Sequence, residues 1–172
     1  IGRAGDADAP DTPLVRFCRL LAEFNALDRS TVAVPGDVAR ARQLLQLRES
    51  MPDAVNRRVG RAKREVDPRI EKTAADMIVP FDRLGALLDL YDAEYARRGL
   101  DAAVWGHISD GNLHPNLIPR TLDDMTRGRE AIFEIARGVI GMDGAPLAEH
   151  GVGRSALKQR LLRELYGNEG IE

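Results

Sequence analysis

The sequence predicts an α+β domain, in which an antiparallel sheet packs against amphipathic helices. Two short apolar runs, residues 102–107 and 113–118, flank the turn residues Ser109 to Asn112, and this pattern is typical of a β-hairpin. Apolar residues recur at helical spacing before and after the hairpin. With 172 residues, the chain is long enough to bury one sizeable core.

The elements outside the hairpin are predicted from caps, apolar spacing and breaking residues. Thr12 and Pro13 should begin the first helix, because threonine is a favoured N-cap and proline fits the first helical position. Glycines that favour helix ends follow three later apolar stripes, at Gly99, Gly141 and Gly167. The first half of the chain is expected to contain a helix from residue 12, a strand over 30–34, a helix over 37–49 and an irregular or partly helical segment over 51–70. A strand over 73–79, a helix capped by Asp82, the hairpin, a long helix and a last helix from about Ser155 should follow in that order.

Composition and charge exclude several classes of function. The net charge of −2 provides no general field for attracting nucleic acid, so no nucleic-acid partner is expected. Cys18 is the only cysteine, which rules out an intrachain disulfide. No apolar run approaches the length of a membrane span, and the N-terminus lacks a signal-peptide pattern. We expect a cytoplasmic protein, with peripheral attachment to a membrane as the alternative.

The chain has only three histidines, and two of them flank the hairpin turn. Residues on paired strands face one another, so His107 and His114 could offer two imidazoles to one point. A divalent transition metal accepts such nitrogens and a carboxylate oxygen at about 2.0–2.1 Å, and Glu149 is the candidate carboxylate. Three protein ligands would leave an open position, as in a catalytic metal site. Zn, Mn, Co and Fe suit this set nearly equally.

His150, the third histidine, directly follows Glu149. Neighbouring side chains point apart in extended backbone, so His150 should be free to act as a general acid or base if Glu149 faces the metal. Its reference pKa of about 6.5 suits that work. Spacing alone leaves a second interpretation open, in which these are ordinary structural histidines beside a common turn.

Two segments together resemble a known family. "GHISDGNLHPN" and "EHGVGRSALKQ" resemble the two signature segments in the C-terminal domain of FAD-linked oxidases. That family includes D-lactate dehydrogenases, D-2-hydroxyglutarate dehydrogenases and the glycolate oxidase flavoprotein subunit. "EKTAADMIVP" and "LQLRES" resemble two further family segments. The resemblance runs from about Thr12 to the end and is most specific in the last seventy residues.

The resemblance implies a ferredoxin-like cap domain of an FAD-dependent oxidoreductase that acts on the CH–OH group of a D-2-hydroxy acid. In the metal-dependent members, matching residues bind zinc or a similar divalent ion, take the substrate hydroxyl proton, or hold the substrate. The matching positions are His107, His114 and Glu149 for the metal, His150 for the base, and Arg48 and Asn116 for the substrate. Lactate, glycolate and 2-hydroxyglutarate are the expected types of substrate.

Some positions depart from the family pattern. Ser109 replaces the usual glycine, Leu147 and Ala148 replace a Ser-Gly pair, and Ala74 stands where some members carry a lysine. These departures put the shape of the pocket in doubt and leave no substrate lysine to assign.

No glycine-rich phosphate cradle occurs in the sequence, and the chain begins with Ile1. We therefore expect a cap domain over 12–172, whose partner is an N-terminal FAD-binding domain of the same protein. Residues 1–11 are rich in Gly, Ala, Asp and Pro and should form a flexible segment. The residues that hold FAD are not identified. The chain alone should not oxidise substrate; the electron acceptor is open, and a homodimer is compatible with the sequence.

Three other functions stay open. A related flavoenzyme cap could have lost its metal; ether-lipid synthases carry "HHHG" where this chain has "AEHG", so Glu149 favours the metal-binding branch. A free-standing zinc hydrolase could use the same three ligands around activated water. A purely structural or oligomerising domain would leave the histidine cluster unexplained.

Overall fold

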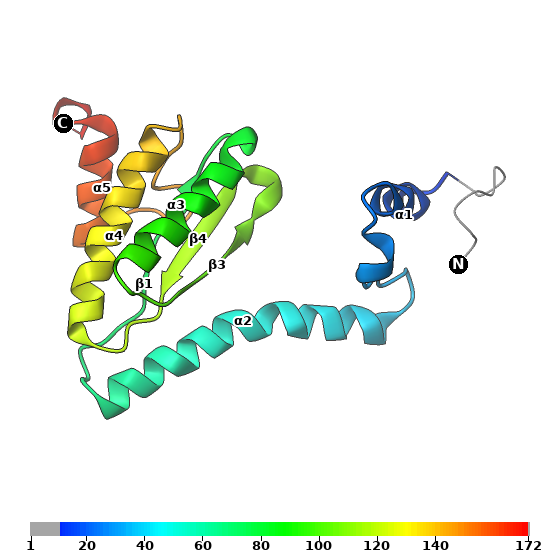
Figure 1. The fold of residues 1–172 in the computed structure, drawn as a ribbon, viewed down its shortest axis with the longest axis horizontal. Coiled ribbons are helices and arrows are strands. Elements are labelled where there is room, and N and C mark those ends of the chain that lie inside the picture. Colours follow the sequence, from blue (N-terminus) through cyan, green and yellow to red (C-terminus); the bar gives the residue numbers. More distant parts are fainter. Residues whose placement is uncertain (1–10, 172) are drawn as a thin grey trace. The chain divides into compact units, whose positions relative to one another are not determined.

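The computed structural model describes residues 11–171, and the chain divides into two compact units between Met51 and Pro52. The described residues form five α-helices and a four-stranded antiparallel sheet, which confirms the α+β class (Figure 1). The elements are α1 (Pro13–Glu23), α2 (Val38–Glu65), β1 (Thr73–Ala74), β2 (Met77–Ile78), α3 (Leu84–Arg97), β3 (Ala102–His107), β4 (Asn112–Leu117), α4 (Leu122–Ile140) and α5 (Ala156–Tyr166).

The first unit contains α1 and the start of α2. The Thr12 side chain accepts a hydrogen bond from the Val15 backbone N–H, and Pro13 is the first helical residue, as predicted. The strand predicted over 30–34 is wrong, because the described chain is irregular there. A strand needs a partner for its backbone hydrogen bonds, and no described strand lies in this unit. The flexible segment predicted over residues 1–11 lies outside the described residues except for Asp11.

Helix α2 corrects the predicted end of the helix over 37–49, and it forms the helical part of the segment over 51–70, which was predicted to be irregular or partly helical. It continues through Pro52 to Glu65. An interior proline costs about 3 kcal/mol, because it removes one helical hydrogen bond. After the proline, apolar side chains recur at helical spacing and are buried, and each buried valine contributes roughly 1.5–3 kcal/mol. This second core consists of Val55, Val59, Ala62, Ile70, Ile118 and Met125. Long-range burial therefore outweighs the local helix breaker.

The sheet is built around β4, which pairs with β3 on one side and with β1 and β2 on the other. The strand predicted over 73–79 is present as two short pieces separated by Ala75 and Asp76. Because side chains alternate along a strand, Leu113 and Leu117 face the main core while His114 and Asn116 face the opposite side.

The main core lies between one face of the sheet and helices α3, α4 and α5. Helix α4 begins with a capping box formed by Thr121 and Asp124, and Ser155 caps α5, as predicted from its position. Asp82 does not cap α3; it lies in a short 3-10 turn, and the helix begins after Arg83.

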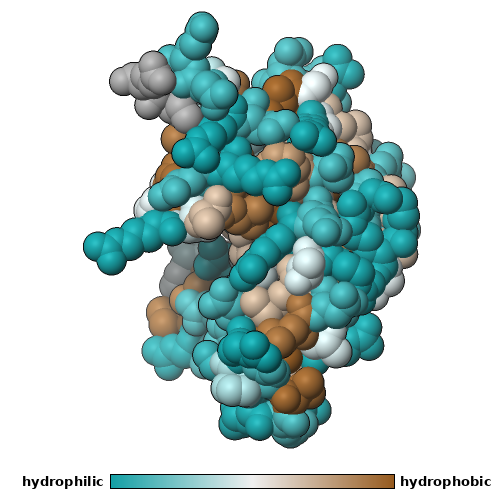
Figure 2. All heavy atoms as spheres, turned by 90° about the vertical axis from the view of Figure 1, so that its left-hand side faces the viewer, coloured by the Kyte–Doolittle hydropathy of each residue, from teal (hydrophilic) through white to brown (hydrophobic). Residues whose placement is uncertain are grey.

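The face of the molecule shown in Figure 2 is mostly hydrophilic, with apolar side chains in small separate groups.

The predicted hairpin between β3 and β4 is confirmed. Its turn closes at Gly111, whose φ of +74° lies in the left-handed region that glycine adopts without strain. A Cβ at this position would lie 2.1 Å from the carbonyl oxygen of Val79, so only glycine fits here.

No helix in the part of the chain that the structure describes has the length and apolar character that a bilayer crossing needs.

Candidate metal centre

The hairpin brings two histidines together at its turn end. His107 is the last residue of β3, and His114 lies on β4 opposite Trp105. Their ring centroids are 5.8 Å apart and the rings are perpendicular. Buried residues of α2 belong to the cluster that packs against Trp105 on this face of the sheet, whereas residues 106–110, which follow Trp105, are exposed. The two imidazoles therefore meet at an open edge of the domain.

A separate segment carries Glu149 and His150 to this edge. After α4, Ala145 exchanges two backbone hydrogen bonds with Ile78 at 2.8 and 2.9 Å. The N–H of Ala148 then donates to the backbone oxygen of Asp76 at 3.2 Å. This pairing aligns the segment along β2, so that the following residues reach the hairpin histidines.

The carboxylate of Glu149 lies at the centre of the cluster. Its Oε1 atom is 3.5 Å from Nε2 of His107, 3.1 Å from Nε2 of His114 and 3.3 Å from Nε2 of His150. Tetrahedral ligands with bonds of about 2.0–2.1 Å are separated from one another by about 3.3–3.4 Å. The separations of Glu149 from the two hairpin histidines, 3.5 and 3.1 Å, are therefore close to the spacing of ligands around one zinc-sized ion.

Among the residues that the structure describes, two sets of three side chains have ligand atoms within 4.8 Å of one another. They are His107, His114 and Glu149, and Asp76, His114 and His150. An imidazole lone pair lies in the plane of its ring, so two rings share an ion only where their planes converge. His114 and His150 stack at 4.6 Å with an interplanar angle of 23°, so they are directed at different points. The first set is the better metal site, and His150 is left beside it.

The expectation that Glu149 and His150 point apart is wrong. Their side chains are in contact, because the chain bends here instead of running extended, and Gly151 follows with a φ of +64°. His150 is nevertheless outside the set of His107, His114 and Glu149, and its ring stacks on that of His114.

The site has a buried floor and an exposed rim. The side chains of His114 and Asp76 are 6% and 2% exposed, whereas those of His107, Glu149 and His150 are 47%, 44% and 54% exposed. A substrate or a partner domain could therefore reach the rim directly, while the floor holds the geometry.

Burial, the largest influence, lowers the pKa of His114 below its usual value, and the carboxylates of Asp76 and Glu149 oppose this shift without reversing it. Burial alone would raise the pKa of Asp76, but the backbone N–H groups of His150 and Glu149 donate to its carboxylate, and the net shift is downward. At neutral pH, His114 is then a neutral imidazole, the form that binds metals, and Asp76 is ionised.

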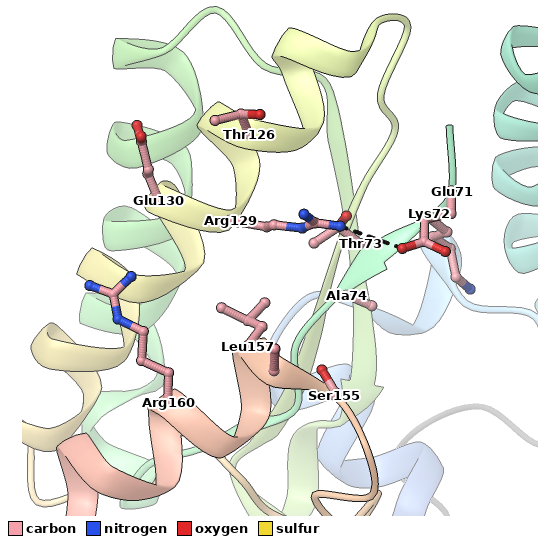
Figure 3. A pocket seen from close by; sticks show the side chains of 11 residues that line it. Glu71, Lys72, Thr73, Ala74, Thr126, Arg129, Glu130, Ser155, Leu157 and Arg160 are labelled. Carbon is pink, nitrogen blue, oxygen red and sulfur yellow. Dashed lines mark hydrogen bonds and ion pairs between the residues drawn. The ribbon is translucent and has the colours of Figure 1, made fainter. Parts of the chain in front are cut away.

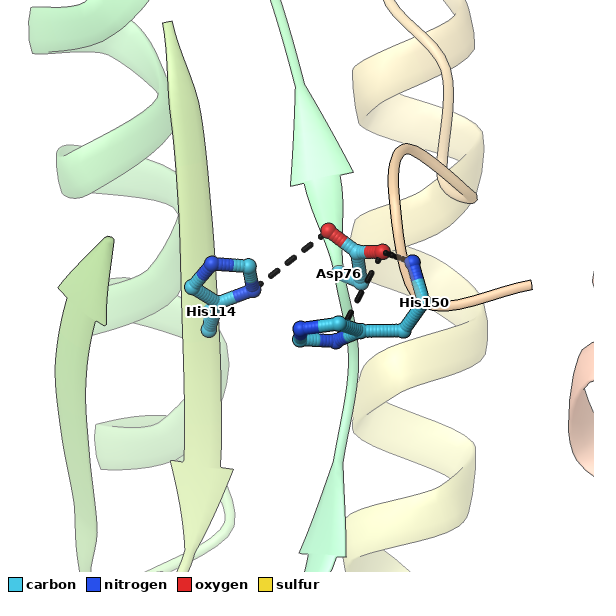
Figure 4. Close-up of side chains that lie close together, drawn as sticks. All are labelled: Asp76, His114 and His150. Carbon is cyan, nitrogen blue, oxygen red and sulfur yellow. Dashed lines mark hydrogen bonds and ion pairs between the residues drawn. The ribbon is translucent and has the colours of Figure 1, made fainter. Parts of the chain in front are cut away.

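Asp76 was not among the residues predicted for the site. In Figure 4, one oxygen of its carboxylate faces His114 and the other faces His150. Its Oδ1 is 3.3 Å from Nδ1 of His114, and its Oδ2 is 3.6 Å from Nδ1 of His150. One signal in the sequence was available: an aspartate inside the apolar run "AADMIVP", since buried carboxylates are rare unless paired.

The two predicted substrate residues lie in different units. Asn116 is 2% exposed on β4, and its Nδ2 donates to the backbone oxygen of His114 at 2.7 Å. Arg48 is exposed on the part of α2 that belongs to the first unit. Asn112, which the sequence did not single out, has a buried Oδ1 without a hydrogen-bond partner among the described residues. The substrate roles of Asn116 and Arg48 stay predictions.

A separate pocket of about 640 Å³ lies between the segment around β1 and helices α4 and α5 (Figure 3). Arg129 and Glu71 approach each other across it at 3.5 Å. The pocket is lined by Glu71, Lys72, Thr73, Ala74, Thr126, Arg129, Glu130, Ser155, Ala156, Leu157 and Arg160. None of the predicted metal ligands lines it, so the histidine cluster is a distinct site.

Comparison with known proteins agrees with the two motifs. Residues 4–172 match the family described as FAD linked oxidases, C-terminal domain. The chain is 31% identical over 107 residues to the probable mitochondrial D-lactate dehydrogenase of Danio rerio, a match that covers 61% of this chain and 21% of the relative. It is 31% identical over 99 residues to the glycolate oxidase subunit GlcD of Bacillus subtilis (strain 168), with 56% and 21% covered. The matches thus span about a fifth of the length of these curated relatives. The chain belongs to the family of FAD-linked oxidase C-terminal domains.

Proposed function

We propose that this chain is the substrate- and metal-binding cap of an FAD-dependent enzyme that oxidises a D-2-hydroxy acid to the 2-oxo acid. The observation that carries the proposal is the convergence of three imidazole Nε2 atoms on one oxygen of Glu149. The names of the two relatives add support, because lactate and glycolate are both 2-hydroxy acids.

His107, His114 and Glu149 would hold a divalent ion, with zinc the first choice and Mn, Co and Fe as alternatives. When bound, such an ion supplies Lewis-acid polarisation of the substrate oxygens, and FAD supplies the acceptor for a hydride. The protein contributes the orientation of its three donors. His114 is held on the buried floor, while His107 and Glu149 lie on the rim and leave the solvent side open.

His150 would act as the general base. Its exposed ring lies beside the ligand set, with Nε2 3.3 Å from Oε1 of Glu149. In the oxidation, Nε2 accepts the proton of the substrate hydroxyl, and the hydrogen on the adjacent carbon leaves as a hydride. The substrate thus loses one proton and one hydride, which leaves the carbonyl of the 2-oxo acid.

Arg48 and Asn116 would bind the substrate. A guanidinium forms paired hydrogen bonds with a carboxylate, which suits Arg48 for the acid group shared by all 2-hydroxy acids. Asn116 lies two residues from His114 on the same face of β4, next to the proposed metal ligand.

The proposed partner is an FAD-binding domain that would face the exposed rim and hold most of the flavin. We also infer a ferredoxin-like topology for the cap. The placement of β4 between β3 and the β1–β2 edge, with Ala145 and Leu147 pairing beside β2, supports this inference. A cytoplasmic location stays a prediction from the sequence.

The test uses the flavoprotein that contains this chain. Oxidation of D-lactate, glycolate and D-2-hydroxyglutarate is followed with an artificial dye as electron acceptor, before and after a chelator and again after addition of Zn²⁺ or Mn²⁺. We expect activity to fall on chelation and to return with metal. Replacement His150→Gln should lower turnover by about 10²–10⁴-fold while metal binding is kept, and Asp82→Asn, an exposed control, should change neither.

Two results would contradict the proposal. Full activity after complete removal of metal would favour the metal-independent cap. Hydrolysis of esters by the zinc-loaded chain, without oxidation by the flavoprotein, would favour a zinc hydrolase.

A further inference from the structure

We propose that Asp76 is the positioning residue of this centre: it anchors the Glu149–His150 bend to the sheet and determines which nitrogen of His114 faces the metal. The second part rests on the proposed metal site, whereas the anchoring does not. Asp76 would act through its neighbours and would not itself bind the ion.

The anchoring role follows from the backbone contacts of Asp76. Its Oδ2 accepts hydrogen bonds from the N–H of Glu149 at 2.7 Å and from the N–H of His150 at 2.6 Å. Residues 149 and 150 lie in a bend outside any helix or strand, so these N–H groups have no secondary-structure partner. One ionised carboxylate thus satisfies two adjacent donors, and hydrogen bonds to a charged acceptor are the stronger kind.

The orienting role follows from the other oxygen. Oδ1 of Asp76 lies 3.3 Å from Nδ1 of His114, and both atoms are buried without a hydrogen-bond partner among the described residues, so each is the nearest group that could satisfy the other. An ionised carboxylate favours a proton on the nitrogen that faces it. With that proton on Nδ1, the lone pair of His114 is on Nε2, the atom next to Glu149. Carboxylates that fix a ligand histidine in this way are common around metal sites.

The geometry argues against Asp76 as a ligand. It forms a set of possible donors with His114 and His150, but the nearly parallel rings of that set are directed at different points. Oδ2 is already engaged by two backbone N–H groups. The carboxylate therefore accepts two hydrogen bonds on Oδ2, from residues 73 and 74 positions later in the sequence, while its Oδ1 faces Nδ1 of His114.

The first experiment measures Zn²⁺ affinity of the full chain by competition with a chromogenic chelator. Asp76→Asn keeps the shape of the side chain and removes its charge, and we expect one site that binds zinc about 10–100-fold more weakly. Glu149→Gln, which removes a ligand, should abolish stoichiometric binding. Asp82→Asn, the same change at an exposed position, and Ile135→Val, a mild loosening of the core, should bind like the unchanged chain.

The second experiment separates orientation from general stability. With only three histidines, the imidazole nitrogens can be assigned individually in long-range ¹H–¹⁵N spectra of the zinc-loaded chain. We expect a hydrogen-bonded Nδ1 proton on His114 that shifts or exchanges rapidly in Asp76→Asn and is unchanged in Ile135→Val. A variant that is only less stable would lower the melting temperature without moving this resonance.

The outcomes distinguish this inference from the proposed function. If the unchanged chain binds no zinc, the metal centre and the orienting role are both overturned. The anchoring role is then tested by amide exchange of the unchanged chain, which needs no variant to fold. Slow exchange at Glu149 and His150 supports the anchor, and exchange at the rate of an unstructured peptide overturns it. If zinc binds but Asp76→Asn binds within twofold of the unchanged chain, or leaves the His114 proton in place, the orienting role is overturned while the metal site stands.

Discussion

Replacement of Gly111 by alanine tests how strongly the hairpin turn holds the two histidines in place. Gly111 has a φ of +74°, and a left-handed conformation costs a residue with a Cβ about 1–2 kcal/mol. The new Cβ would also lie 2.1 Å from the carbonyl oxygen of Val79, so the turn must move away. That movement breaks the hydrogen bond that the Val79 N–H donates to the Gly111 oxygen at 3.1 Å, which adds about 1–1.5 kcal/mol.

The expected loss for Gly111→Ala is therefore about 3 kcal/mol of unfolding free energy. Gly99→Ala is the matched control, because Gly99 has a φ of +60° and nothing within 4 Å of the added Cβ. It should lose only the conformational part, about 1–2 kcal/mol. Urea unfolding followed by the fluorescence of Trp105, the single tryptophan, measures both. Equal losses in the two variants would refute the close packing of the turn against Val79. Zinc affinity should also fall in Gly111→Ala and stay unchanged in Gly99→Ala, because only the first displaces His107.

Three further predictions concern the helices and the activity of the chain. Burial would raise the pKa of Glu94, but hydrogen bonds from Arg97 and Arg98 prevail and lower it from its usual 4.5. The stability that Glu94 contributes is thus present above pH 4.5 and is lost as the pH falls through its folded pKa. The melting temperatures of the unchanged chain and of Glu94→Gln should therefore differ at pH 7 and converge in acid. A difference that stays constant with pH would contradict this. Pro52→Ala restores a helical N–H in α2 and should raise the unfolding free energy by about 1–3 kcal/mol, with more helical circular dichroism; no change in either would contradict a helix that is continuous through residue 52. The 172-residue chain without a flavoprotein should not oxidise D-lactate with any dye acceptor, and turnover would show that it needs no separate flavin domain.

The parts of the fold with strong local signals could be predicted from the sequence. The hairpin is encoded by turn residues between two apolar runs, and Thr12 and Ser155 cap their helices because the capping contact lies within one turn. The continuation of α2 could not be predicted in this way. Pro52 is a local breaker, whereas the burial of Val55 and Val59 depends on a sheet formed by residues much later in the chain.

The site shows the same division. His107 and His114 are paired by the local hairpin, and the motif singled out Glu149 and His150. The contact between those two side chains was missed, because the direction of a side chain in a bend depends on the backbone angles. Asp76 was missed because its role depends on convergence with a segment 73 residues later, which no local pattern encodes.

The most direct test of the central claim is anomalous diffraction at the zinc edge from crystals of the chain grown with Zn²⁺. We predict one strong peak bound by Nε2 of His107, Nε2 of His114 and a carboxylate oxygen of Glu149, at about 2.0–2.1 Å from each, with Asp76 outside bonding distance. A fully zinc-saturated crystal with no peak there, or with the ion held instead by Asp76 and His150, would contradict it.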